Sequence, residues 1–144
     1  MVRMSLFKWS SAQSIYLPEI AAEHRALYRL GDELHKALLA GAELAQLKPI
    51  AVNLAESLEQ HFRHEERLMH AIHYDAFAWH KRQHDAARKK SKALAKSIEG
   101  GDSAAASDLL AFLSVWLRDH LCVSDRMMSA RLRNYLCYNT SLAS

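Results

Sequence analysis

Apolar residues recur at intervals of three and four positions in four segments of the chain, which places them on one face of an α-helix. The segments run from Ile20 to Leu38, from Leu47 to Leu68, from Phe77 to Ile98 and from Leu109 to Leu132. Short connections join them, as in bundles whose neighbouring helices run antiparallel. The pattern predicts an all-α protein, an up-down-up-down antiparallel four-helix bundle.

Turn-forming residues mark the expected ends of these helices. Gly41 follows the first helix and Gly100–Gly101 follows the third, where glycine commonly ends a helix. Asp75 is placed to cap the start of the third helix with its side-chain oxygen. The fourth helix is expected to begin after Asp102 or Ser103.

The chain of 144 residues has the length of one domain, with an extension predicted at each end. Residues 1–18 show no lasting period, end in Pro18 and are expected to form an N-terminal arm laid over the bundle. Residues 19–134 form the predicted bundle. Residues 135–144 form a C-terminal tail that either extends the last helix or caps the bundle.

Composition and charge exclude several classes of protein. Half of the residues are hydrophobic and there are only four Gly and two Pro, which excludes collagen, low-complexity disorder and a disulfide scaffold. The net charge of +3 is too balanced to indicate a nucleic-acid partner. No apolar run approaches the ~18 residues that span a bilayer, and the first residues lack the apolar core of a signal peptide. We therefore expect a cytoplasmic protein with no membrane partner; the oligomeric state stays open, with a monomer favoured.

Every predicted apolar stripe also carries a titratable side chain that a bundle core normally excludes. Burying such a group without a partner costs several kcal/mol for a charge. A single inward histidine is usually a hydrogen-bonded core residue, but so many on facing stripes are most simply explained by a bound metal centre. The seven residues are His24, His61, Glu65, His80, His84, His120 and Asp125.

The spacing of these residues supports convergence at one level of the bundle. His61 and Glu65 are four positions apart, as are His80 and His84, so each pair shares a helix face. The first pair lies about 10 residues before the middle of the link near Asp75, and the second about 8 residues after it. At a rise of ~1.5 Å per residue, antiparallel helices bring both pairs to the same layer.

His120 and Asp125 are five positions apart, which an ideal α-helix places about 140° out of phase. A one-residue π-bulge between them would restore a common face. Otherwise the two side chains reach inward from the edges of one stripe. The sequence leaves both alternatives open.

The donor set indicates which metal the site would take. Five imidazoles and two carboxylates are too many for one zinc ion and too rich in nitrogen for calcium or magnesium. They suit two first-row ions, iron above all. With two bridging carboxylates and a shared oxo or hydroxo bridge, two octahedral ions would keep one open position. A small ligand such as dioxygen could take that position.

Short motifs surround the seven side chains. They are His-Phe-Arg-His-Glu-Glu at 61–66 with Met69, His-Lys-Arg-Gln-His at 80–84, Trp-Leu-Arg-Asp-His-Leu at 116–121 with Asp125, and Ile-Ala-Ala-Glu-His at 20–24 with the upstream Trp9. Together these motifs resemble the hemerythrin family of single-domain bacterial di-iron bundles, over nearly the whole chain. The resemblance implies reversible dioxygen binding at a di-ferrous centre and no organic cofactor.

The resemblance also implies a role for each ligand. Three histidines hold one iron: His80, His84 and His120. His24 and His61 hold the other iron, which keeps the open position. Glu65 and Asp125 bridge the two irons.

The family pattern further implies an apolar pocket over the open position. Its residues are Phe62, Trp116, Leu117 and Leu121. Such a lining would keep protons and water from the bound gas, although ordinary core packing explains the same side chains. Glu23 either adds negative charge near His24 or faces solvent.

Two functions remain open. The favoured one is a binding protein for oxygen storage, delivery or sensing, and thus not an enzyme. The alternative is an enzyme that uses the same iron pair against peroxide or nitric oxide. Oxidase-type di-iron bundles rely on four glutamates. A site with two carboxylates and five imidazoles favours reversible binding instead.

Overall fold

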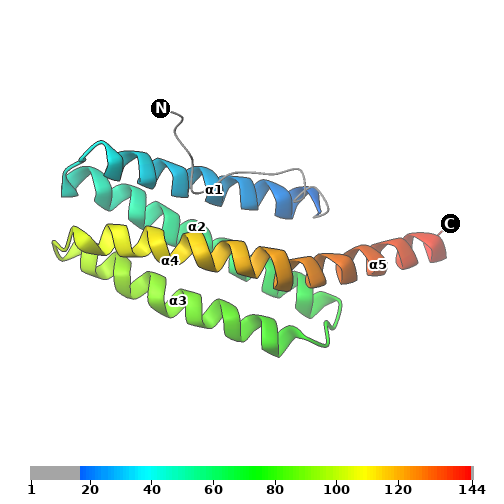
Figure 1. Cartoon of the computed structure of the whole chain (residues 1–144). Coiled ribbons are helices and arrows are strands. Elements are labelled where there is room, and N and C mark those ends of the chain that lie inside the picture. The colour runs from blue at the N-terminus through cyan, green and yellow to red at the C-terminus, as the bar shows by residue number, and fades with distance from the viewer. Residues whose placement is uncertain (1–16, 144) are drawn as a thin grey trace.

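The computed structural model describes residues 17–143, with side chains described up to residue 137, and all its elements there are helical. Figure 1 shows α1 to α4 side by side with alternating directions. The antiparallel four-helix bundle predicted from the sequence is therefore confirmed. The elements are α1 (Pro18–Leu39), α2 (Leu44–Ala71), α3 (Phe77–Glu99), α4 (Ala104–His120), the π-helical turn η2 (Leu121–Asp125) and α5 (Arg126–Ala143).

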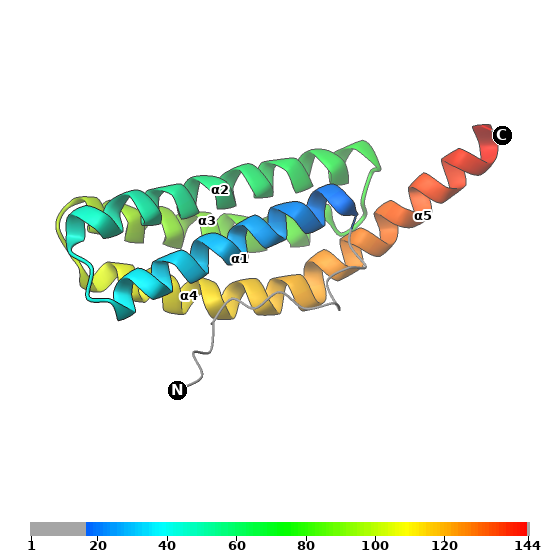
Figure 2. The ribbon, with the colours of Figure 1, turned by 90° about the horizontal axis from the view of Figure 1, so that it is seen from above.

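The helices α4, η2 and α5 follow one another without a break. Figure 2 shows α5 projecting past the end of the bundle, beside the α2–α3 turn. Residues 135–143 thus extend the last helix, one of the two alternatives that the sequence left open. At the other end, Pro18 is already the first residue of α1. The arm was expected over residues 1–18, and its residues 1–16 lie outside the described residues.

The connections are short, and two of them turn on glycine. Gly41 has φ 69° and Gly101 has φ 108°, backbone conformations that favour glycine. The expected cap at Asp75 is wrong: α3 begins at Phe77 after Ala76, and no side chain caps it. Asp102 instead accepts a hydrogen bond from the backbone N–H of Ala104, at 3.0 Å.

Apolar side chains fill the bundle on both sides of a polar layer. The larger cluster lies toward the α1–α2 and α3–α4 turns, and includes Leu34, Leu54 and Leu113. A smaller cluster lies toward the α2–α3 turn, and includes Met69 and Met128. Each cluster keeps water away from one side of the layer between them. No helix among residues 17–143 is long and apolar enough to cross a membrane.

Candidate metal centre

The polar layer contains all seven side chains expected to converge. They come from every helix of the bundle: α1 supplies one, α2 and α3 two each, and α4 with η2 the remaining two. None of them is more than 4% exposed. Their exposed fractions are 0% for His24, 2% for His61, 0% for Glu65, 0% for His80, 0% for His84, 4% for His120 and 0% for Asp125.

Helical spacing explains why these side chains point inward. On α1, His24 lies four positions after the buried Ile20 and three before the buried Leu27, so it shares their face. On α2, His61 follows the buried Leu58 by three positions and Glu65 follows His61 by four. The polar layer therefore interrupts apolar stripes without leaving the core.

The donor atoms form two groups that share both carboxylates. Within each group, every residue offers one atom, and these atoms lie within 4.8 Å of one another. The first group is Glu65, His80, His84, His120 and Asp125. The second group is His24, His61, Glu65 and Asp125. One group thus contains three histidines and the other two.

The three-histidine group is tightly clustered. The Nε2 atom of His120 lies 3.2 Å from that of His84 and 3.1 Å from that of His80. Asp125 Oδ1 is 3.0 Å from His80 Nε2 and 2.9 Å from His120 Nε2. Neighbouring ligands this far apart on an octahedron lie about 2.2 Å from its centre, close to a metal–imidazole bond length.

The outer hydrogen bonds of these rings orient their inner nitrogens toward one another. His84 Nδ1 donates to Glu66 Oε2 at 2.8 Å, and His120 Nδ1 donates to Gln83 Oε1 at 2.7 Å. A neutral imidazole has only one N–H, so both rings turn the lone pair of Nε2 inward. Two lone pairs 3.2 Å apart repel each other unless a proton or a metal ion lies between them, and a metal ion would bind both.

The two-histidine group repeats this arrangement. His24 Nε2 lies 3.2 Å from Asp125 Oδ2, and His61 Nε2 lies 3.4 Å from Glu65 Oε2. His61 Nδ1 donates to Glu23 Oε1 at 2.7 Å. Its Nε2 atom therefore faces the carboxylates, as the inner nitrogens of the first group face the metal donors.

Electrostatics at the centre favour positive charge. No described residue donates a hydrogen bond to any carboxylate oxygen of Glu65 or Asp125, although both side chains are fully buried. Burial by itself lowers the pKa of His61, but Glu65, Asp125 and Glu23 raise it to about 10. Burial likewise opposes ionisation of Glu65, yet His61 and the α3 histidines hold its pKa at about 2. Buried carboxylates that are surrounded by imidazoles in this way fit metal ions.

The π-helical turn brings the last carboxylate into the centre. It inserts one residue into the helix between His120 and Asp125, so that both share one inward face. Both Asp125 oxygens then lie among the histidines of the two groups. Of the two alternatives left open by the sequence, the bulge is the one that forms.

The sequence did not identify three residues that accept hydrogen bonds from the outer nitrogens of the candidate ligands. Glu23 contacts His61, and also His64 Nδ1 at 2.6 Å, rather than extending toward His24 or solvent alone. Glu66 and Gln83 each stand next to a ligand candidate in the sequence, which was the only available signal. Such partners fix the ring orientation and tautomer of a metal-binding histidine.

Arg88 organises one of these partners. Its Nη1 lies 2.8 Å from Glu66 Oε2 and its Nε donates to Glu59 Oε2 at 2.6 Å. The guanidinium thus joins α3 to two carboxylates of α2. It also holds Glu66 in place against His84.

Aromatic rings cover the three-histidine group. Phe62 stacks on His84 with ring centroids 4.1 Å apart, and Trp116 stacks on His120 at 4.3 Å. Leu117 and Leu121, at 1% and 2% exposure, are buried beside them. The predicted cover over the open position involves the same four side chains. Both rings stack on histidines of the three-histidine group, and Phe62 also lies 6.3 Å from the ring of His61 in the other group. A cover over an open position therefore stays a prediction.

Comparison with known proteins places this geometry in a family. The model of the hemerythrin HHE cation binding domain matches residues 17–132. The chain belongs to the hemerythrin family. Membership implies non-haem iron binding, and the cluster of histidines and carboxylates fits a metal site.

Individual relatives agree with this membership. A bacteriohemerythrin of Clostridium acetobutylicum is 29% identical over 125 residues, covering 84% of this chain and 97% of the relative. A bacteriohemerythrin of Stenotrophomonas maltophilia is 25% identical over 133 residues, covering 92% and 86%. A crystal structure of a leucine-to-tyrosine mutant of hemerythrin matches with a TM-score of 0.82 at 23% identity, over 90% of this chain and 98% of that one. This last likeness supports the shared fold.

Proposed function

We propose that this hemerythrin-family chain holds two iron ions with an oxo or hydroxo bridge and binds dioxygen reversibly, for storage, delivery or sensing. The observation that carries the proposal is the unequal division of histidines between two donor groups that share Glu65 and Asp125. With both carboxylates bridging, one iron would have one protein ligand fewer than the other. A small ligand would bind at the coordination position that this iron leaves open.

Each of the seven side chains has a role in this proposal. His80, His84 and His120 would hold the first iron, and His24 and His61 the second. Glu65 and Asp125 would bridge them. Two ferrous ions would supply two electrons and an open coordination position to dioxygen. The chain supplies the fixed geometry.

The surroundings of the centre favour reversibility. Phe62 and Trp116 stack on ligand histidines, and Leu117 packs beside them. These side chains exclude water and offer no acidic proton. A dry apolar wall slows proton delivery to the bound gas, which slows irreversible oxidation of the iron.

Iron analysis and visible spectroscopy of the purified chain test the proposal. We expect two irons per chain and an absorption band that appears in air and fades under vacuum. A colourless protein loaded with zinc would contradict the proposal. Turnover of peroxide or nitric oxide, with no band that fades under vacuum, would establish the enzymatic alternative instead.

A further inference from the structure

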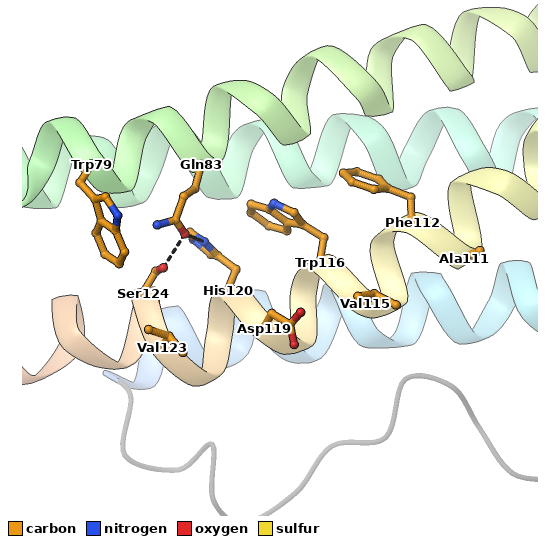
Figure 3. Close-up of a pocket in the computed structure, with 10 residues that line it drawn as sticks. All are labelled: Trp79, Gln83, Ala111, Phe112, Val115, Trp116, Asp119, His120, Val123 and Ser124. Atoms are coloured by element: carbon orange, nitrogen blue, oxygen red, sulfur yellow. Dashed lines mark hydrogen bonds between the residues drawn. The ribbon is translucent and has the colours of Figure 1, made fainter.

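A groove of about 530 Å³ runs along the outer seam of α3 and α4, on the side of His120 that faces away from the metal donors. We name it the α3–α4 groove. Figure 3 shows its lining, with Trp79 at one end and Trp116 further along. The residues that matter here are Trp79, Gln83, Val115, Trp116, Val123 and Ser124. Its volume falls within the range of small-molecule sites, about 300–1,000 Å³.

The groove gathers apolar surface that a folded chain normally buries. Trp79 is 38% exposed, Val115 50% and Val123 53%. These are three of the seven large apolar side chains that are exposed among the described residues. A local concentration of exposed apolar groups around a hollow is typical of a binding site.

The side-chain amide of Gln83, on the floor of the α3–α4 groove, can donate a hydrogen bond to a bound ligand. Gln83 Oε1 already accepts hydrogen bonds from His120 Nδ1 at 2.7 Å and from Ser124 Oγ at 2.5 Å. Its amide nitrogen carries two N–H donors, for which no described residue provides an acceptor. In Figure 3 this nitrogen lies on the side of Trp79.

The orientation of that amide rests on the proposed function. Iron at Nε2 of His120 would leave the ring proton on Nδ1. Only an oxygen can accept that proton, so Gln83 must turn Oε1 toward His120 and its nitrogen toward the groove. The donor and the two indole rings thus belong to one surface.

The charges of the lining restrict the ligand further. Among residues 17–137, no lysine or arginine lines the groove, and Asp119 is the only carboxylate that does. An anionic molecule would therefore find repulsion and no counter-charge. Indole faces prefer flat rings, with which they stack.

We infer that the α3–α4 groove is a second ligand site, which binds an uncharged, flat aromatic molecule between Trp79 and Trp116 and donates a hydrogen bond to it from Gln83. A carbonyl on the ring would be the acceptor. Because Trp116 and Gln83 both contact His120, the occupant lies one side chain away from the metal centre.

Calorimetric titration of the iron-loaded 144-residue chain tests the inference. The probe is acetonaphthone, a flat ring with a carbonyl, and we expect saturable binding of one molecule per chain. Ethylnaphthalene, which lacks the acceptor, should bind about three- to tenfold more weakly, the effect of one hydrogen bond. Naphthoate, the anionic analogue, should also bind more weakly. Equal binding of acetonaphthone and ethylnaphthalene would overturn the hydrogen bond from Gln83.

Substitutions locate the probe. Trp79→Ala should weaken acetonaphthone binding at least about tenfold, because it removes one ring face. Leu39→Ala, at another exposed apolar side chain, should leave it unchanged. Circular dichroism and iron content establish that both variants fold. Undiminished binding by the folded Trp79→Ala variant would overturn the inference.

Three further outcomes separate this inference from others. If sedimentation shows that Trp79→Ala dissociates a dimer, the groove is an interface between copies and the inference is wrong. An iron-loaded chain that does not bind acetonaphthone refutes the groove site and leaves the proposed function intact. A chain that takes up no iron and still prefers acetonaphthone to ethylnaphthalene retains the groove site and refutes the proposed function.

Discussion

The three outer hydrogen bonds differ in charge, although each ends on the Nδ1 atom of a candidate ligand. His61 donates to the carboxylate of Glu23, whereas His120 donates to the neutral amide of Gln83. The carboxylate on His84 is paired with Arg88. A carboxylate partner strengthens the opposite nitrogen as a donor to metal. At the iron held by two histidines, the stronger donor His61 would thus partly offset the smaller number of protein ligands.

Substituting Glu23→Gln tests this compensation. The amide keeps a hydrogen-bond acceptor but removes the charge, so we expect iron affinity to fall about tenfold. Competition with a chelator, followed by iron counting, measures the change. Glu19→Gln, on the exposed face of the same helix, provides the matched control. Equal iron retention by the two variants would show that the charge of Glu23 does not matter.

At the scale of elements, the π-helical turn η2 decides whether the last helix can supply two donors. It inserts one residue, and the apolar stripe resumes beyond it at Met128 and Leu132. The helix therefore carries one residue more than an uninterrupted α-helix would need. Cys122 in the turn is exposed and does not line the α3–α4 groove.

Two single-residue deletions test whether the extra residue in η2 sets the positions of His120 and Asp125. Deleting Cys122 should convert the turn to α-helix and leave His120 and Asp125 four positions apart on one face. We expect nearly full iron content in that variant. Deleting Ser114, in the middle of α4, rotates the helix on one side of it by about 100°. We expect iron content to fall to less than about one tenth.

Iron content and circular dichroism of both deletion variants provide the measurement. Loss of iron in the Cys122 deletion, with helix content preserved, would show that the π-helical turn is itself required. Retention of iron in the Ser114 deletion would contradict the proposed register of α4.

For the whole molecule, the centre connects four helices between two apolar clusters. Each cluster packs its own end of the bundle, but the polar layer between them buries carboxylate oxygens to which no described residue donates a hydrogen bond. Metal binding to the folded state alone adds to stability by mass action. Iron and fold are therefore expected to be lost together.

Removing one ligand measures this coupling. His120→Ala should lower iron content and reduce the free energy of unfolding by about 4 kcal/mol if free iron is about a thousandfold above its dissociation constant. The melting temperature would fall by roughly 10 °C. His70→Ala, at an exposed histidine outside both donor groups, is the control. An unchanged melting temperature in His120→Ala would refute the coupling.

The sequence by itself determined the bundle and the inward set of seven. Four stripes with helical spacing can bury their apolar faces only against one another, and His24 or His84 at stripe positions must then enter the core. The turns at Gly41 and Gly101 follow from local backbone preference. These features depend on spacing within single segments, which a sequence shows directly.

Only the tertiary structure decided the contacts between helices. Glu23 meets His61 across 38 positions, and Gln83 meets His120 across 37. The π-helical turn between His120 and Asp125 places the Asp125 carboxylate beside histidines of the other helices. Such features depend on how helices rotate and slide as they pack, and the spacing within one helix contains no information about the neighbour it will meet.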